Sequence, residues 1–263
     1  MSTYDADQYL TQTQNFFQNP DKKNQVNGGC AVVKYVIEHS TGKHCVQKST
    51  SLKLCGKLFQ QEVKAVSKFH HPAIIPFIGF AVDNQKGYIY LKEAEKGSLE
   101  RCLNERRIEM QNDSYKNEFT PLWDDTHKLI IAYGVARAME YLHSQNTLHR
   151  DLNPNNILID DDLFPYITDF GTTKVVDNAK TIGQTLAKTI EPTLAKYMPP
   201  EFLNDYMTYN ESLPIDVYSY AMVLYRLWTE LKIYPCLSEL KILQAVFKGT
   251  RPEFPKGNYQ GEN

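Results

Sequence analysis

The first third of the chain alternates short apolar runs with turn-forming residues, a pattern typical of β-strands. The run CAVVKYVI at Cys30–Ile37, the turn HSTGK and the run HCVQK predict a β-hairpin. Two more strands are predicted around Ile74–Val82 and Tyr88–Leu91. Before these strands, residues 57–69 carry apolar side chains every three or four positions, which predicts an amphipathic helix with Glu62 in its middle. The apolar face of this helix is expected to consist of Leu58, Val63, Val66 and Phe69.

The pattern in the rest of the chain is mostly helical. A short helix is predicted over Gly97–Arg107. A long one is predicted over residues 124–144, which begin with Asp-Asp-Thr, residues that favour a helix N-cap. Two further helices are predicted at Asp216–Leu231 and near Ser238–Phe247. A strand-rich first part with one helix, followed by a mainly helical part, indicates an α+β fold. Residues 1–24 are polar and are expected to form a loosely ordered arm.

Composition and charge narrow the class of protein. The 263 residues are 42% hydrophobic and 23% charged, as in soluble globular proteins, and the net charge of −2 gives no field that attracts nucleic acid. No apolar run approaches the roughly 20 residues that span a bilayer, and the N-terminus lacks a signal-peptide pattern. Five scattered cysteines without a CxxC pair argue against a disulfide framework and a zinc site. These features predict a cytosolic or nuclear protein, with the cytoplasm as the expected compartment, that neither binds nucleic acid nor inserts into a membrane.

Three polar motifs stand out against this pattern. The string HRDLNPNN covers His149–Asn156, and Asp169-Phe170-Gly171 follows Asn156 by thirteen residues. Lys48 ends the predicted strand HCVQK, and Glu62 lies in the helix after it. Taken singly, each motif also fits a simpler role, such as a polar turn or a solvated lysine. Phosphoryl transfer, however, needs a cation, metal-binding oxygens and a carboxylate base, and together these motifs supply all three.

The order of these motifs resembles that of the protein-kinase catalytic domain, in its serine/threonine or tyrosine-kinase-like branch. Further along, Tyr197–Glu201 resembles the motif that closes the activation segment, and Gly249–Pro252 resembles a later turn. Asp216–Tyr220 resembles the start of the helix whose aspartate braces the catalytic-loop backbone. The resemblance implies a two-lobed fold: a small antiparallel sheet lobe with one helix over residues 25–94, and a larger, mainly helical lobe over residues 95–263.

By this resemblance, Asp151 orients the acceptor hydroxyl and accepts its proton, while Asn156 and Asp169 bind magnesium. Lys48 is expected to hold the α- and β-phosphates of ATP, with Glu62 holding the lysine. The resemblance also implies a set of ATP-binding residues: Gly28, Gly29, Val33, Val46, Lys48, Leu91, Lys92, Ala94 and Leu158. The stack that links the lobes is expected to consist of Val66, Phe77, His149 and Phe170.

The sequence departs from the family at several places. The glycine-rich loop reads VNGGCA, so that only its middle glycine survives at its position. Asn153 stands where serine/threonine kinases usually carry a lysine that touches the γ-phosphate, and the family's last helices are expected to be missing after the turn at Gly249–Pro252. The resemblance implies an ATP- and Mg²⁺-dependent kinase that acts on serine or threonine hydroxyls of protein substrates. The alternative is a pseudokinase, which binds nucleotide or serves as a scaffold without transfer.

Overall fold

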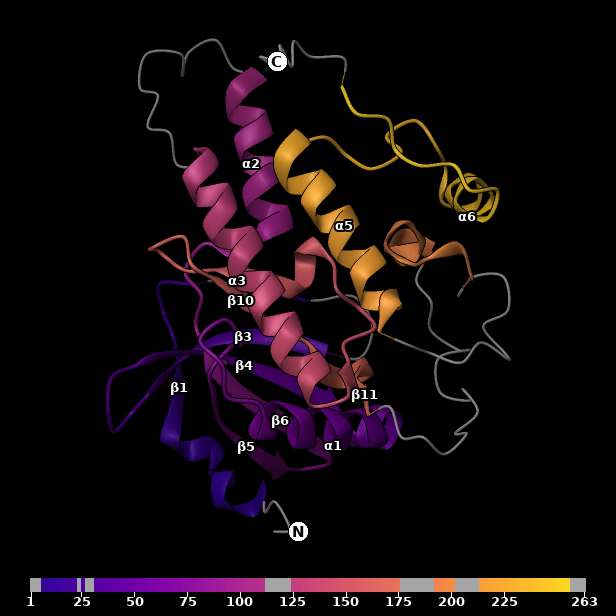
Figure 1. Cartoon of the computed structure of the whole chain (residues 1–263). Coiled ribbons are helices and arrows are strands. Elements are labelled where there is room, and N and C mark those ends of the chain that lie inside the picture. The colour runs from indigo at the N-terminus through magenta and orange to yellow at the C-terminus, as the bar shows by residue number, and fades with distance from the viewer. Residues whose placement is uncertain are drawn as a thin grey trace.

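The computed structural model describes residues 6–22, 25–26, 31–111, 124–175, 192–201 and 213–255. They form two lobes, with an antiparallel sheet and one long helix in the first and a group of helices in the second (Figure 1). The two-lobed α+β fold expected from the sequence is confirmed. One hydrophobic core runs through both lobes, from Phe59 and Val66 in the first long helix to Val246 in the last.

The sheet of the first lobe has six antiparallel strands. Its order is β1-β3-β4-β6-β5 with β2 beside β3, and the strands are β1 (Phe16–Gln18), β2 (Gln25–Val26), β3 (Ala31–Glu38), β4 (His44–Ser51), β5 (Phe77–Asp83) and β6 (Lys86–Lys92). Strands β3 and β4 confirm the predicted hairpin. Strand β5 begins three residues later than predicted, because Pro76 has no N–H to donate to a sheet. Ile74 and Ile75 pack into the core instead.

Helix α1 (Leu52–Lys68) packs against this sheet and begins five residues earlier than predicted. Its backbone departs from helical geometry at Cys55, where φ is −128°. The buried side of the helix includes Phe59, Glu62, Val63 and Val66. Leu58 is 41% exposed, so its expected place on the apolar face is wrong. Phe59 takes that place because it lies four residues before Val63, on the same side of the helix.

The N-terminal segment is ordered against the sheet, so the expectation of a loose arm is wrong for its described part. It forms two short 3₁₀ turns, η1 (Ala6–Tyr9) and η2 (Thr13–Asn15), followed by strand β1, which pairs with β3. The ring of Phe16 stacks on that of Tyr90 with 3.8 Å between centroids. Both rings belong to a small apolar cluster that is separate from the core under α1. The segment therefore covers the second face of the sheet, which would otherwise expose aromatic surface to water.

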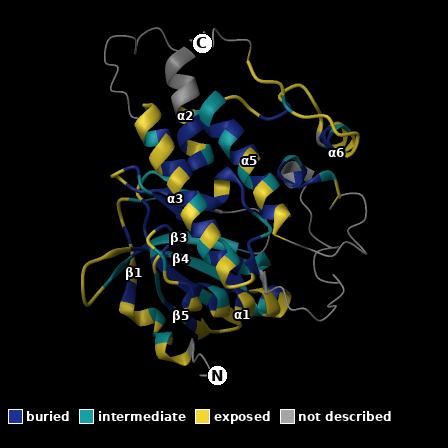
Figure 2. Ribbon diagram, viewed as in Figure 1, coloured by how far each residue is buried: buried dark blue, intermediate teal, exposed yellow. Residues whose placement is uncertain are grey.

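The second lobe consists mainly of helices. Among the described residues, the long helices of this lobe are α2 (Leu99–Gln111), α3 (Asp125–Ser144), α5 (Pro214–Thr229) and α6 (Glu239–Phe247). All four were predicted, with ends that differ by at most four residues. Asp124 accepts a hydrogen bond from His127 N at 2.8 Å, which confirms the predicted N-cap of α3. Helices α3 and α5 turn their buried sides toward the core and their exposed sides outward (Figure 2).

The segments that connect these helices contain short strands and 3₁₀ turns. They are β7 (Gly97–Ser98), β8 (Thr147–Leu148), η4 (Pro154–Asn156), β9 (Ile157–Ile159), β10 (Pro165–Ile167), η5 (Phe170–Thr172), β11 (Lys174–Val175) and η6 (Pro192–Tyr197). Strand β9 pairs with β7 and β10, and β8 pairs with β11. Helix α3 approaches β10 so closely that a Cβ atom on Gly134 would lie 2.6 Å from Pro165 Cγ. This packing fixes the two loops that carry the polar motifs.

Within the ranges described, no helix is both long and apolar enough to cross a bilayer. Cys45 and Cys102 are buried free thiols, and Cys236 is an exposed one. Cys55 is disulfide-bonded, so the scattered cysteine spacing was a poor guide to disulfide content. Spacing in the sequence does not report which side chains the fold brings together.

Candidate active site

The loop between β8 and β9 carries the string His149–Asn156 and is fixed by helix α5. Asp216, in the first turn of α5, is buried and accepts hydrogen bonds from the backbone N–H groups of His149 and Arg150, each at 2.9 Å. His143 Nε2, near the end of α3, lies 2.9 Å from the same carboxylate. The φ angle of Arg150 is +67°, in the left-handed region that non-glycine residues rarely occupy. The contacts of Asp216 hold the loop in this strained conformation, as the expected brace requires.

Asp151 is held by two asparagine side chains. Asn156 Nδ2 donates to the backbone oxygen of Asp151 at 2.8 Å and to its Oδ2 at 2.9 Å. Asn153 Nδ2 donates to the same backbone oxygen at 3.0 Å and to Oδ1 at 2.9 Å. Burial raises the pKa of Asp151, and the charge of Asp169 adds to this, while His149 and the asparagine amides act in the opposite direction. The carboxylate thus has a fixed orientation and a higher proton affinity than an exposed aspartate.

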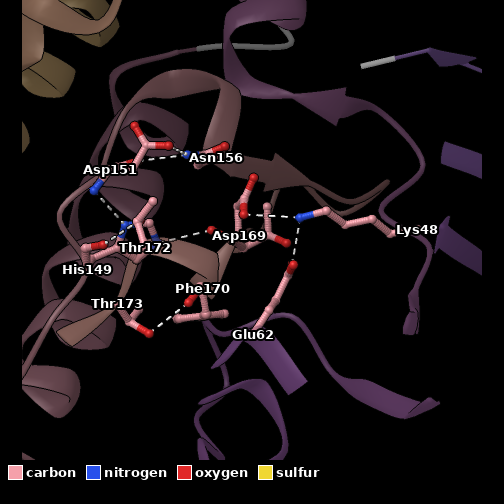
Figure 3. A network of polar contacts seen from close by, with 10 residues as sticks. Lys48, Glu62, His149, Asp151, Asn156, Asp169, Phe170, Thr172 and Thr173 are labelled. Carbon is pink, nitrogen blue, oxygen red and sulfur yellow. Dashed lines mark hydrogen bonds and ion pairs between the residues drawn. The ribbon is translucent and has the colours of Figure 1, made fainter. Parts of the chain in front are cut away.

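His149 connects this loop to the segment after β10. Its Nε2 donates to the backbone oxygen of Thr168 at 3.0 Å, and its Nδ1 accepts from Asp151 N at 3.3 Å. Thr168 N donates in turn to the backbone oxygen of Asn156 at 3.0 Å. These bonds bring Asp169 to the side of the loop on which Asp151 and Asn156 lie (Figure 3).

Asp169 also has a left-handed backbone, with φ +65° and ψ +73°. The residue after it, Phe170, is buried, and its ring lies 5.4 Å from that of His149 and 5.8 Å from that of Phe69. Val66 and Phe77, the other two expected members of the stack, pack in the same core. The anchored ring of Phe170 supports the strained conformation of Asp169 and so fixes the direction of its carboxylate.

Lys48 lies between two carboxylates. Its Nζ is 2.7 Å from Glu62 Oε1 and 3.1 Å from Asp169 Oδ1 (Figure 3). Burial alone would lower the pKa of Lys48, but the two carboxylates outweigh burial and raise it. Burial raises the pKa of Glu62, whereas at Asp169 the attraction of Lys48 outweighs burial and lowers the pKa. The lysine is therefore protonated at neutral pH, and one cation between two carboxylates leaves a site that attracts further positive charge.

The strand register arranges the expected nucleotide-site residues of the first lobe on one face. Lys48 in β4 lies directly opposite Val33 in β3. Val46, two residues before Lys48, lies opposite Leu91 in β6. Residues that are opposite each other, or two apart in one strand, point to the same side of a sheet. All four side chains therefore face the side from which α1 presents Glu62.

The other expected nucleotide-site residues lie near the junction of the lobes. Lys92 ends β6, and its N–H donates to the backbone oxygen of Pro76 at 2.9 Å, so this N–H is already engaged. Ala94 is buried two residues later, and Leu158 is half-buried in β9. Gly28 and Gly29 lie outside the described residues, and their contact with phosphate stays a prediction.

The donor set fits the magnesium ion that the resemblance implies. Asn156 commits its Nδ2 to Asp151, which leaves its Oδ1 as an oxygen ligand. The side chain of Asp169 is 42% exposed, with Lys48 on one oxygen. In the part of the chain that the structure describes, no group of three or more His, Cys, Asp or Glu side chains forms a metal site. A magnesium site does not need one, because Mg²⁺ commonly takes one or two protein ligands together with substrate phosphates and water.

The sequence alone did not indicate how two residues, His143 and Asn153, act in the site. His143 approaches Asp216 from the end of α3, and nothing in the local sequence distinguishes it from an ordinary helix histidine. Asn153 was singled out for the lysine that it replaces, not for its contact with Asp151. The signal for that contact was present, because short polar side chains two residues apart in a loop often bond to each other and to nearby backbone.

Known proteins match the chain along most of its length. Residues 23–256 match the family model of the protein kinase domain. The chain is 33% identical over 200 residues to RGS domain-containing serine/threonine-protein kinase A of Dictyostelium discoideum, and 32% identical over 209 residues to probable serine/threonine-protein kinase drkD of the same organism. It is 30% identical over 203 residues to the leucine-rich repeat receptor-like serine/threonine/tyrosine-protein kinase SOBIR1 of Arabidopsis thaliana.

These three matches cover 75%, 79% and 75% of this chain, which in turn spans 16%, 14% and 29% of the length of the relatives. The family match covers strands β2 to β6 of the sheet lobe, α1, the loop that carries Asp151 and helix α5. Because the match runs through nearly the whole chain and through both halves of the site, the chain belongs to the protein kinase family.

Proposed function

We propose that this chain is an active protein kinase, which transfers the γ-phosphate of Mg²⁺-bound ATP to serine or threonine hydroxyls of other proteins. The observation that carries the proposal is the pair of contacts made by Lys48, at 2.7 Å to Glu62 and 3.1 Å to Asp169. A buried cation between two carboxylates is expensive to desolvate. A scaffold that binds no nucleotide has no use for such a cluster, so the cluster supports a phosphate-binding site. The Asp151 carboxylate, held at both oxygens by Asn153 and Asn156, supports transfer over nucleotide binding alone.

Lys48 and Glu62 hold the phosphates in this proposal. The ammonium of Lys48 is protonated and contacts the α- and β-phosphates, while Glu62 fixes its position from helix α1. Asn156 Oδ1 and Asp169 are the oxygens that hold magnesium. When bound, the ion neutralises the negative charge on the phosphates and on the group being transferred.

Asp151 acts as the base. Its carboxylate accepts the proton of the substrate hydroxyl as the hydroxyl oxygen bonds to the γ-phosphorus; the bond to the bridging oxygen breaks and ADP leaves. Burial raises the pKa of Asp151, which makes the carboxylate a stronger base than an exposed aspartate. The hydrogen bonds from Asn153 and Asn156 fix its direction before the substrate arrives.

The adenine lies, in this proposal, against the apolar side chains of Val33, Val46, Leu91 and Leu158, with the backbone at Lys92 and Ala94 along its edge. The shared face of the first three supports this placement. An apolar surface with a few polar backbone groups at its edge is the usual form of a site for a planar ligand.

Serine and threonine are the proposed acceptors, on proteins as substrates. The support is the printed names of relatives, which include serine/threonine-protein kinases, and Pro154 in the catalytic loop, which resembles the serine/threonine version of that loop. The cytoplasm is the proposed compartment, because it supplies the Mg²⁺ and ATP that the transfer needs.

Transfer of radiolabel from ATP to a generic protein substrate tests the proposal. The variants are Lys48→Met and Asp169→Asn, and their matched controls are Lys57→Met and Asp162→Asn, which alter exposed residues of the same types. Wild type and both controls should transfer label, while each site variant should lose about 100-fold or more of the rate. If wild type and the site variants are equally silent while ATP still raises the melting temperature, the chain is a nucleotide-binding scaffold.

A further inference from the structure

Asn153 is buried at the start of the 3₁₀ turn η4, with 1% of its surface exposed. Its Oδ1 accepts a hydrogen bond from Asn155 N at 2.9 Å and so caps the turn. Its Nδ2 donates to the backbone oxygen of Asp151 at 3.0 Å and to Asp151 Oδ1 at 2.9 Å. The side chain therefore points back at Asp151.

The hydrogen-bonding capacity of this side chain is already committed. A primary amide has two N–H donors, and both donors of Asn153 go to Asp151. With so little exposed surface and no donor left, the amide cannot act toward a phosphate as the family's lysine does. Asn153 thus contacts the base and does not offer the phosphate contact expected of a lysine at this position.

The two asparagines hold Asp151 in a paired arrangement. Asn153 bonds to Oδ1 and Asn156 bonds to Oδ2, each at 2.9 Å. Both amides also bond to the backbone oxygen of Asp151. A carboxylate that is held at both oxygens cannot rotate about its Cβ–Cγ bond without breaking a hydrogen bond. Because a reacting group must be aligned to within a fraction of an ångström, this restraint bears directly on rate.

We propose that Asn153 is a positioning residue, whose side-chain amide fixes the Asp151 carboxylate in the orientation from which it accepts the proton of the substrate hydroxyl. The inference rests on the proposed kinase activity. It goes beyond that activity by assigning to Asn153 an effect on the transfer step and none on nucleotide binding. Asn156 cannot replace it, because Asn156 restrains the other carboxylate oxygen.

The test compares Asn153→Ser and Asn153→Ala with wild type and with the matched control Asn155→Ala, whose exposed side chain lies two residues away. Serine keeps an oxygen that can cap η4, so Asn153→Ser separates the contact to Asp151 from the folding of the turn. Steady-state kinetics with ATP and a protein substrate should show kcat lowered about tenfold to a hundredfold in Asn153→Ser, with KM for ATP within about twofold of wild type. Asn155→Ala should match wild type in both.

A second readout does not depend on activity. Crystal structures of wild type and Asn153→Ser should show one orientation of the Asp151 carboxylate in wild type, and a rotated or split carboxylate in the variant. An unchanged kcat in Asn153→Ser, with or without a raised KM for ATP, would overturn the inference and leave the proposed kinase activity standing. If wild type transfers no phosphate, the proposed function fails, and the crystal structures alone then test the inference. An Asp151 carboxylate that has not moved in Asn153→Ser overturns the inference, and a displaced carboxylate supports it.

Discussion

The carboxylate of Asp216 accepts a hydrogen bond from the backbone N–H of His149 at 2.9 Å, although the two residues are 67 positions apart in the chain. Asp216 lies in the first turn of α5, a helix that begins at Pro214 and packs into the core. Ser219, one turn later, donates to the backbone oxygen of Tyr197 at 2.7 Å. Helix α5 therefore fixes both the loop that carries Asp151 and the segment at η6.

Asp216→Asn should destabilise the protein although the two side chains have the same shape. One carboxylate oxygen becomes an NH₂ group, which cannot accept the N–H of His149 or Arg150, so a buried donor loses its partner. We expect a loss of about 3 kcal/mol in the free energy of unfolding, measured by urea denaturation at neutral pH. Asp162→Asn, at an exposed aspartate, is the control and should change it by less than about 0.5 kcal/mol. Equal stability of the two variants would contradict the role given to Asp216.

The contribution of Asp216 should depend on pH in a defined direction. Burial alone would raise its pKa, but the hydrogen bonds from His143, His149 and Arg150 outweigh burial and lower it. A carboxyl whose pKa is lower in the folded protein stabilises the fold fully above its unfolded pKa of about 3.9, and loses this effect as pH falls through the folded value. The difference in unfolding free energy between wild type and Asp216→Asn should therefore be constant down to about pH 4 and shrink below it. A difference that already shrinks between about pH 7 and 5 would assign the effect to another group.

Phe16→Ala should show that the N-terminal segment is part of the folded lobe. The ring of Phe16 is buried on Tyr90, so its removal should cost about 3 kcal/mol of unfolding free energy. The neighbouring Phe17 is 41% exposed, and Phe17→Ala should cost less than about 1 kcal/mol. Thermal and urea unfolding of the two variants provide the comparison. A loose arm would make both substitutions equally harmless.

Glu62→Gln should impair catalysis through Lys48. The glutamine keeps the size of Glu62 but not its charge. Of the two carboxylates that contact Lys48, only that of Asp169 then carries a charge. The ammonium should shift toward Asp169, and kcat/KM for ATP should fall about tenfold or more. Glu140→Gln is the control, because Glu140 forms an exposed pair with Arg137 that contributes little. Unchanged kinetics in Glu62→Gln would show that the ion pair does not position the lysine for transfer.

The sequence was a good guide wherever local chemistry decides the structure. Asp124 was recognised as the N-cap of α3, because capping depends on one side chain and the backbone next to it. The motifs around Asp151 and Asp169 were recognised in the same way, because their residues are close together in the chain. Lys48 and Glu62 followed from the order of those motifs in a known family.

The sequence was a poor guide wherever a distant part of the chain decides. Leu58 and Phe59 are equally apolar neighbours, and only the position of α1 on the sheet selects Phe59 for the core. Phe16 lies in a polar segment, and its burial depends on Tyr90, which lies more than seventy residues away. Asn153 has its partner two residues away, but whether its amide turns to Asp151 or to solvent depends on the packing of the whole loop.

The most direct test of the whole account is a crystal structure of the chain with Mg²⁺ and a non-hydrolysable ATP analogue. We expect the metal to be bound by Asn156 Oδ1 and Asp169, and Lys48 Nζ to contact the α- and β-phosphates. Asp151 should face the γ-phosphate from the position held by Asn153 and Asn156. A nucleotide bound away from Lys48, or bound beside Lys48 with Asn156 and Asp169 away from the metal, would contradict this arrangement.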